Sequence, residues 1–281
     1  MFLCFAVASG VVGFDKAQAG PPDSSAAIKL VAVCFLEAAM MANLILRSRW
    51  SAWRLILAAM FVFYGVTTFM PQIESAVFLT RLPPGTLPRL FLMGALIGIP
   101  FSLLAVLILG KARTGAADAE RNTRLQMPAS EWGWKLAVIV IAYVVLYFTF
   151  GYFVAWQNPV LREYYGGVDN GFVSQMGSVL RDTPWLVPFQ ILRALCWVAI
   201  AVPVVRMLRG GCLESALTVA LLFSVLMNAQ LLLPNPYMPD TVRMSHLIET
   251  ASSNFLFGML VGWLLLQRQA SPGLVAAYDV S

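Results

Sequence analysis

Residues Pro239–Arg268 read PDTVRMSHLIETASSNFLFGMLVGWLLLQR, and this stretch indicates the fold most directly. Its second half, Phe255–Leu266, is apolar enough for the interior of a lipid bilayer. No proline interrupts Thr241–Arg268, and Asp240 can cap its first turn, so we expect one helix of roughly 28 residues, about 42 Å long. The hydrocarbon core of a membrane is about 30 Å thick, so the polar first half must stand in the interface and the outer leaflet. Ionisable groups at that depth favour a functional role.

The composition of the whole chain supports a membrane protein. Hydrophobic residues make up 59% of the 281 residues and charged residues 12%, against about 45–50% and 25% in soluble domains. Together with a mean hydropathy of +0.76, this excludes a soluble globular protein. The formal net charge of +5 does not require a nucleic-acid partner, because membrane proteins keep basic residues at the cytoplasmic ends of their spans. The four cysteines show no CxxC spacing, which favours packing roles over a disulfide or a metal site.

Further apolar segments resemble the second half of this stretch in length and composition. They predict six more spanning helices at Ala26–Leu46, Trp53–Met70, Leu87–Leu109, Trp134–Trp156, Leu186–Leu208 and Glu214–Leu233. With Thr241–Arg268 they predict an all-α polytopic transmembrane helix bundle of seven spanning helices. We expect residues 26–268 to form a single helical domain, preceded by a hydrophobic N-terminal segment and a Pro/Ser-rich break (residues 1–25). Residues 269–281 would be a short tail.

The N-terminal segment has two interpretations. Met1–Phe14 is apolar but too short to span a membrane comfortably, and Ala17-Gln18-Ala19 resembles a signal-peptidase site. No Lys or Arg precedes the apolar run, which is unusual for a signal peptide. The segment is therefore either a signal peptide or a short eighth span.

The distribution of basic residues predicts the orientation. Eleven of the nineteen Lys and Arg residues form tight clusters that fall on one side of the predicted bundle: Arg47, Arg49, Arg54, Lys111, Arg113, Arg121, Arg124, Lys135, Arg206, Arg209 and Arg268. The positive-inside rule places this side in the cytoplasm. We therefore expect a multi-pass protein of the cell inner (plasma) membrane with a cytoplasmic C-terminus.

Several polar residues lie deep in the predicted spans. At 1.5 Å per residue from the basic boundary, Glu37 lies about 15 Å deep, and Arg193, Asn228 and Asn254 lie at about 20 Å. A charged side chain that faces lipid at this depth costs several kcal/mol, so these groups should face inward and find partners. We expect Glu37 to pair with Arg193, either as a buried ion pair that fixes packing or as a counter-ion pair beneath a ligand pocket. Asn228 and Asn254 are candidate ligand contacts, although asparagines at this depth more typically form hydrogen bonds between helices.

His246, the only histidine, and Glu249 are three residues apart on the last predicted helix, so they share a face, with Ser253 one turn further. This face could hold a proton-relay pair, since histidine titrates near neutrality, or it could be a solvated helix start. One His and one Glu do not complete a zinc site, so no metal is expected. On the outer connection before residue 184, Arg162 and Arg181 could bind a phosphate or carboxylate, or they could simply reach to the membrane interface.

Three functional hypotheses remain open. The first is an outward-facing polar site for a small anionic molecule or lipid headgroup, serving transport or sensing, with Arg181, Arg193 and Arg243 as charge partners. The second is an intramembrane or interfacial enzyme with His246 and Glu249 as acid and base. The third is a structural or assembly subunit whose polar layer only fixes packing. No HExxH, GxSxG, P-loop or GxGxxG motif is present, so no cofactor is expected, and the predicted partners are membrane lipids and a small anionic ligand.

Overall fold

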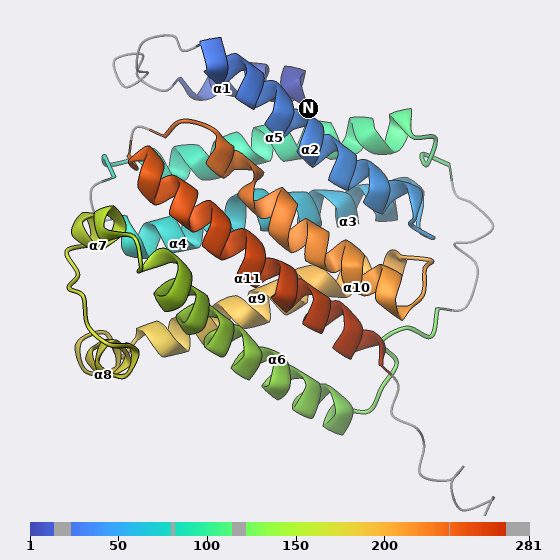
Figure 1. Ribbon diagram of the computed structural model, residues 1–281. Coiled ribbons are helices and arrows are strands. Elements are labelled where there is room, and N and C mark those ends of the chain that lie inside the picture. The colour runs from blue at the N-terminus through green and yellow to red at the C-terminus, as the bar shows by residue number, and fades with distance from the viewer. Residues whose placement is uncertain (14–23, 80–81, 114–121, 236, 268–281) are drawn as a thin grey trace, which may run out of the picture.

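The computed structural model describes residues 1–13, 24–79, 82–113, 122–235 and 237–267. Within these ranges every regular element is helical, apart from one isolated β-bridge between Ser48 and Leu208. The long helices run back and forth between the two ends of one bundle (Figure 1). The predicted all-α fold is therefore confirmed. The predicted tail 269–281 and the candidate cleavage site at Ala17-Gln18-Ala19 lie outside the described residues.

Seven of the described helical segments are long and apolar enough to cross a membrane, which confirms the predicted number of spans. They are, in chain order, α2 (Ser24–Leu46), the continuous run α3–η2–α4 (Ala52–Tyr64, Gly65–Phe69, Met70–Phe78), α5 (Thr86–Ile108), α6 with η4 (Ala129–Phe150, Gly151–Ala155), α9 (Leu186–Met207), α10 with η5 and η6 (Cys212–Leu221, Leu222–Leu226, Ala229–Leu232) and α11 (Asp240–Leu266). The elements η2, η4 and η5 are π-helical turns, and η6 is a short 3-10 helix. Seven such helices fit an integral, multi-pass membrane protein.

Pro71 does not end the second span, so the predicted boundary at Met70 is wrong. The chain passes through the π-helical turn η2 and continues as α4 to Phe78. The amide of Met70 donates to the carbonyl of Gly65, five residues back, and this wider turn directly precedes the proline. Proline is tolerated in the first turn of a helix, because its missing N–H is not needed there. The extended helix carries Glu74 into the bundle, where the sequence had indicated a connecting loop.

Three shorter helices complete the described structure: α1 (Phe2–Val12), α7 (Pro159–Tyr165) and α8 (Phe172–Asp182). Helix α1 packs against α5 and buries Cys4 and Ala8. Its 11 described residues are fewer than the roughly 20 that a span needs, so it is not among the seven helices counted above. None of the residues of helix α8 is buried.

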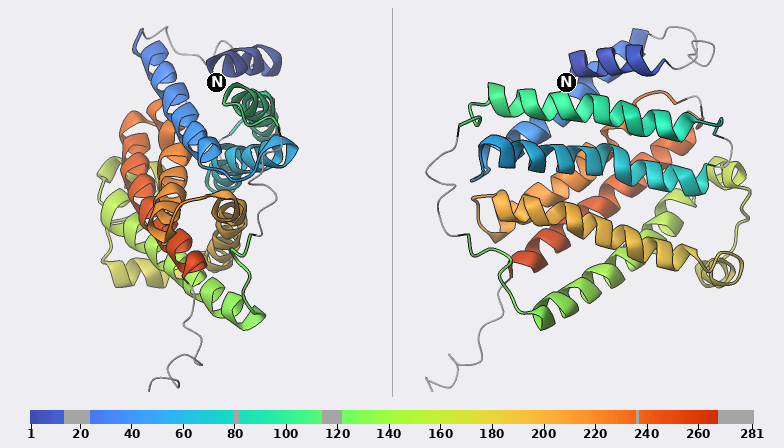
Figure 2. Two further views of the ribbon diagram at one scale, coloured as in Figure 1. Left: turned by 90° about the vertical axis from the view of Figure 1, so that its right-hand side faces the viewer. Right: turned by 180° about the vertical axis from the view of Figure 1, so that it is seen from behind.

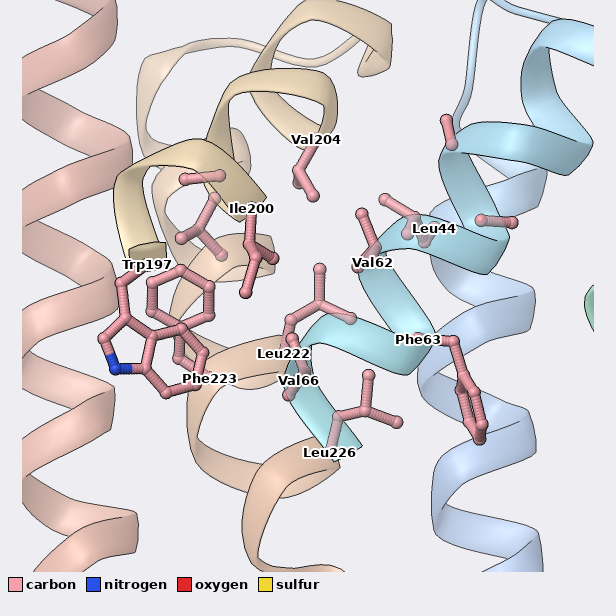
Figure 3. Close-up of a cluster of buried hydrophobic side chains, with 14 of the residues drawn as sticks. Leu44, Val62, Phe63, Val66, Trp197, Ile200, Val204, Leu222, Phe223 and Leu226 are labelled. Carbon is pink, nitrogen blue, oxygen red and sulfur yellow. The ribbon is translucent and has the colours of Figure 1, made fainter. Parts of the chain in front are cut away.

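An apolar core fills the middle of the bundle, where α2, α3, α9 and η5 meet (Figure 3). Trp197 of α9 packs against Phe223 of η5 with ring centroids 4.2 Å apart. Ile200 of α9 packs so closely on the backbone of η2 that a Cβ added to Gly65 would come within 2.9 Å of it. This core holds α9 against the second span. It therefore fixes the position of Arg193, which lies one helical turn before Trp197.

Helices α10 and α11 pack through small residues. A Cβ added to Gly258 would lie 2.6 Å from Cα of Ala220, and one added to Gly262 would lie 2.5 Å from Cα of Ala216. Glycines four residues apart let two helix backbones approach closely, which is a common way to associate helices within a lipid bilayer. The close approach sets the distance of α11 from the rest of the bundle.

The two ends of the bundle differ in charge. At one end, on the right in Figure 1, the loops between spans carry the predicted basic clusters and are tied together. The amide of Arg49 donates to the carbonyl of Met207 at 2.7 Å, and Lys111 Nζ donates to the carbonyl of Ser48 at 3.0 Å. We call this the basic end. Helices α7 and α8 lie at the opposite end, on the left in Figure 1 and on the right in the view from behind in Figure 2. The described basic clusters therefore share one end, while its cytoplasmic location stays a prediction.

Candidate functional site

A cavity of about 500 Å³ lies among the spans towards the end that carries α7 and α8. Its lining comes from α4, α6 and η4, α7, α8, α9, η6 and α11, so five of the seven spans contribute to it. The π-helical turns η2 and η4 lie next to or within the lining segments of their spans. Turns of this kind occur frequently at functional sites in helices, because they change the direction of the side chains that follow.

A bidentate ion pair forms one side of the cavity. Arg193 of α9 donates from Nη2 to Oε2 of Glu74 at 2.6 Å and from Nη1 to Oε1 at 3.2 Å. Nη1 also donates to Oε1 of Gln190 at 3.1 Å. The predicted pairing of Arg193 with Glu37 is therefore wrong. Glu74 is the carboxylate that pairs with Arg193, because the second span continues past Pro71 and brings Glu74 to the level of the guanidinium.

A hydrogen-bonded chain of three side chains lies beside this pair. His246 Nδ1 and Glu249 Oε2 are 2.9 Å apart, and His246 Nε2 lies 3.0 Å from the hydroxyl of Tyr165 on α7. Burial raises the pKa of the Tyr165 phenol, so its hydroxyl stays protonated and can donate to Nε2 when the imidazole is neutral. A neutral imidazole then carries its proton on Nδ1 and donates to the carboxylate. The shared face predicted for His246 and Glu249 is confirmed, and it turns towards the cavity.

Amide and hydroxyl groups form the part of the lining that lies further along α11 than Glu249. The hydroxyl of Thr250 donates to Oδ1 of Asn228, whose Nδ2 donates to the carbonyl of Ser224 at 2.7 Å. Nδ2 of Asn254 lies 3.0 Å from the sulfur of Met227. Both asparagines are thus engaged in contacts within and between spans, as expected, and both also line the cavity.

The structure gathers some of the predicted site residues and separates others. Arg193, Asn228, His246, Glu249 and Asn254 all line the cavity. The remaining three, Glu37, Arg181 and Arg243, do not.

These three residues lie in different surroundings. Arg243 is 3% exposed and donates to the carbonyls of Leu231 and Leu233 at 2.6 and 2.7 Å, so it holds the turn before α11. Arg181 is exposed in the last turn of α8. Glu37 is buried on α2, a helix that packs against η5, η6, α3 and α5 rather than around the cavity.

The aromatic walls of the cavity were not predicted. Tyr143 and Tyr147 of α6, Trp156 after η4, Tyr165 of α7 and Phe257 of α11 all face it. These residues come from two spans and a connection, so no local spacing in the sequence joins them. Most of the cavity surface is apolar, and the polar groups described above make up a smaller part of it. Such a site suits a molecule with an apolar body and a polar head.

A second cavity, of about 400 Å³, lies at the basic end. Its charged groups are engaged with the protein: Lys135 pairs with Glu131 at 2.6 Å and donates to the carbonyl of Gln267 at 2.6 Å. Arg124 donates to the carbonyl of Val205 at 3.0 Å. These contacts fix the loops of the basic end, so the larger cavity is the better candidate.

Two of the geometric features are typical of functional sites in membranes. Ionisable side chains from three spans meet within the bundle, and each is paired with another rather than with lipid.

Among the described residues no group of three or more His, Cys, Asp or Glu side chains could hold a metal ion. Comparison of the chain with protein-family models, curated proteins and solved structures gives no match, so its function has to be argued from this site.

Proposed function

We propose that this integral membrane protein binds a small amphipathic molecule in the cavity between α4, α6, α9 and α11, and that binding serves transport or sensing. The observation that carries the proposal is the convergence of Glu74, Arg193, His246 and Glu249 on one apolar-walled cavity of about 500 Å³. A volume of this size matches the clefts that hold small molecules in other proteins. A subunit whose polar residues only fixed packing would be expected to fill such a space with side chains.

The positive-inside rule adds an orientation. If the basic end is cytoplasmic, the cavity lies in the outer half of the membrane and faces outward. The ligand could then arrive from the external medium or from the outer leaflet. A lipid headgroup and a free amphipathic molecule share the chemistry that this lining recognises, namely a polar head with an apolar body.

Gly151 gives a direct test of binding in the cavity. It begins η4 and lines the cavity, and a Cβ added there would lie at an ordinary contact distance of 3.6 Å from Oε1 of Glu249. Gly151→Leu should therefore place a larger side chain in the cavity. Gly133 lies on the same span, is exposed, and has no atom within 4 Å of an added Cβ. Gly133→Leu is thus the matched control.

The measurement is the melting temperature of the purified protein with three aryl probes of different charge: tetraphenylphosphonium, tetraphenylborate and triphenylphosphine oxide. A ligand that binds only the folded state raises the melting temperature by mass action. We expect at least one probe to stabilise the wild type and the Gly133→Leu control, and none to stabilise Gly151→Leu. Equal stabilisation of Gly151→Leu, or no effect of any probe, would contradict a binding cavity.

One observation favours a second function. Glu249, His246 and Tyr165 form a carboxylate–imidazole–hydroxyl chain that faces the cavity, and a carboxylate that orients a histidine is the arrangement used in general acid–base catalysis. An enzyme of this kind would use His246 to move a proton to or from a substrate. It ranks second because the hydroxyl in the chain belongs to a half-buried tyrosine of raised pKa, which is a weak nucleophile.

A further inference from the structure

The charges in the cavity indicate which kind of ligand it accepts, given the binding function proposed above. The charged residues of its lining are Glu74, Glu249 and Arg193, together with the titratable His246. With a neutral imidazole the sum is one positive and two negative charges, a net of −1. With a protonated imidazole the sum is zero.

Arg193 has little capacity left for an anion. Its two terminal nitrogens already bind both oxygens of Glu74 and the side-chain oxygen of Gln190. Its Nε is buried and has no partner among the described residues. An anionic ligand would have to displace the Glu74 carboxylate and leave that charge without its partner, which is costly inside a membrane.

Glu249 has an oxygen to spare. Oε2 binds His246, whereas no hydrogen bond to Oε1 is found in the part of the chain that the structure describes. A Cβ added to Gly151 would lie 3.6 Å from Oε1, and the glycine that stands there has no side chain to cover this oxygen. The carboxylate therefore presents an acceptor that an incoming positive group or N–H donor can reach.

The walls also favour positive charge. The rings of Tyr143, Tyr147, Tyr152, Trp156, Tyr165 and Phe257 line the cavity. Aromatic faces carry partial negative charge and attract cations. Arg193 already shows this interaction within the protein, with its guanidinium carbon 5.9 Å from the ring centre of Tyr143.

A cation and a proton would thus have the same effect on the charge of the cavity, since either one brings the net of −1 to zero. We propose that the cavity binds a monovalent lipophilic cation in exchange for a proton on His246. Binding of the cation beside Glu249 disfavours the imidazolium, and the proton leaves to the aqueous phase. His246 contacts Glu249 on its own helix and Tyr165 on α7. The other titratable groups that line the cavity with it are Glu74 on α4, Tyr143, Tyr147 and Tyr152 on α6 and η4, and Arg193 on α9.

The pH dependence of affinity follows from this exchange. Each bound cation releases one proton, so the apparent affinity falls about tenfold for each pH unit below the pKa of His246 and levels off above it. The sign is opposite for an anion, which would bind better as the imidazole becomes protonated. Tetraphenylphosphonium and tetraphenylborate are matched probes for this question, because they share size and shape and differ in charge.

The experiment measures equilibrium binding of both ions to the purified full chain between about pH 5.5 and 8.5, the range around the ordinary histidine value. We expect tetraphenylphosphonium to bind more tightly than tetraphenylborate at the upper end, and to weaken by at least tenfold at the lower end. Glu249→Gln should lose at least tenfold in affinity at high pH. His246→Gln should bind the cation with no such dependence on pH. Glu163→Gln, an exposed carboxylate of α7 outside the cavity lining, is the matched control and should behave like the wild type.

Tighter binding of tetraphenylborate, or cation binding with the same pH profile in the wild type and in His246→Gln, would overturn the inference. Failure of both ions to bind would also overturn it. If neither ion binds, the neutral probe triphenylphosphine oxide distinguishes failure of the cation exchange from failure of the binding function. If triphenylphosphine oxide still stabilises the wild type and not Gly151→Leu, the binding function stands without the cation exchange. If it has no effect, both proposals fall.

Discussion

A guanidinium inside a membrane stays charged, so its stability depends on the carboxylate within its reach. Arg193 is 3% exposed and has Glu74 as that carboxylate, with two parallel hydrogen bonds and a further bond to Gln190. Bidentate geometry of this kind is the strongest form of ion pairing between side chains. Its loss therefore leaves a charge with no partner in a region of low dielectric constant.

We predict that Glu74→Gln and Arg193→Met each destabilise the protein by about 3–5 kcal/mol, whereas the double substitution costs less than the sum, because it removes both charges together. Unfolding of the detergent-solubilised variants measures the three changes. Glu37→Gln combined with Arg193→Met is the control, and its effects should add, since Glu37 lies on another face of the bundle. Additive losses in the Glu74 and Arg193 cycle would show that these two residues do not stabilise one another.

At this scale the sequence predicted those contacts that depend on local geometry. His246 and Glu249 share a face because three residues make nearly one helical turn. Glu74 was missed because its place depends on a π-helical turn before Pro71, and no residue pattern marks such a turn. Arg243 was assigned to a ligand but binds backbone carbonyls of the turn before α11. Which acceptor a long side chain reaches is decided by the folded chain.

Among the elements, α10 and α11 form the closest helix pair, and their contact shows how the site is positioned. Gly258 and Gly262 meet Ala220 and Ala216 at backbone distance. Lipid offers no hydrophobic driving force for helix association, so close backbone packing and hydrogen bonds must hold the pair together. Because α11 also carries His246 and Glu249, this contact sets how far those side chains extend into the cavity.

We predict that Gly262→Ala destabilises the protein by about 1–3 kcal/mol, because the new Cβ would overlap the backbone of α10 and force the helices apart. The same substitution at Gly177 of α8 meets nothing within 4 Å and should have little effect. Thermal melting of both variants checks this. An unchanged melting temperature for Gly262→Ala would contradict the close packing of α10 and α11.

Spanning helices are the feature that the sequence predicts best, because the cost of placing polar backbone or side chains in lipid applies to each residue separately. All seven predicted spans are present. The errors lie at helix ends, where proline at position 71 was taken as a stop. The close contact of α10 with α11 depends on which helices are neighbours in the bundle. The spacing of the glycines at 258 and 262 does not identify the helix that packs against them.

At the scale of the whole molecule, the orientation of the bundle in the membrane decides on which side the cavity lies, and the charge distribution predicts that orientation. The described basic clusters gather at one end, and the cavity lies towards the other. The energy that sets topology acts on short basic loops during insertion, before the bundle forms. The sequence therefore predicts the orientation without any knowledge of the cavity, whereas the cavity itself needed the packed structure.

The orientation can be tested with cysteine labelling in intact cells. Cys212 is exposed and begins α10 at the basic end, so we expect it to react only with a membrane-permeant reagent. Ser174 is exposed on α8 at the opposite end, and Ser174→Cys in a Cys212→Ser background should react with an impermeant reagent as well. Both positions lie on described helices at opposite ends of one bundle, so their accessibilities must differ if the chain spans the membrane. The reverse pattern would place the cavity on the cytoplasmic side. Its ligand would then come from the cell interior, and the proton released by His246 would enter the cytoplasm.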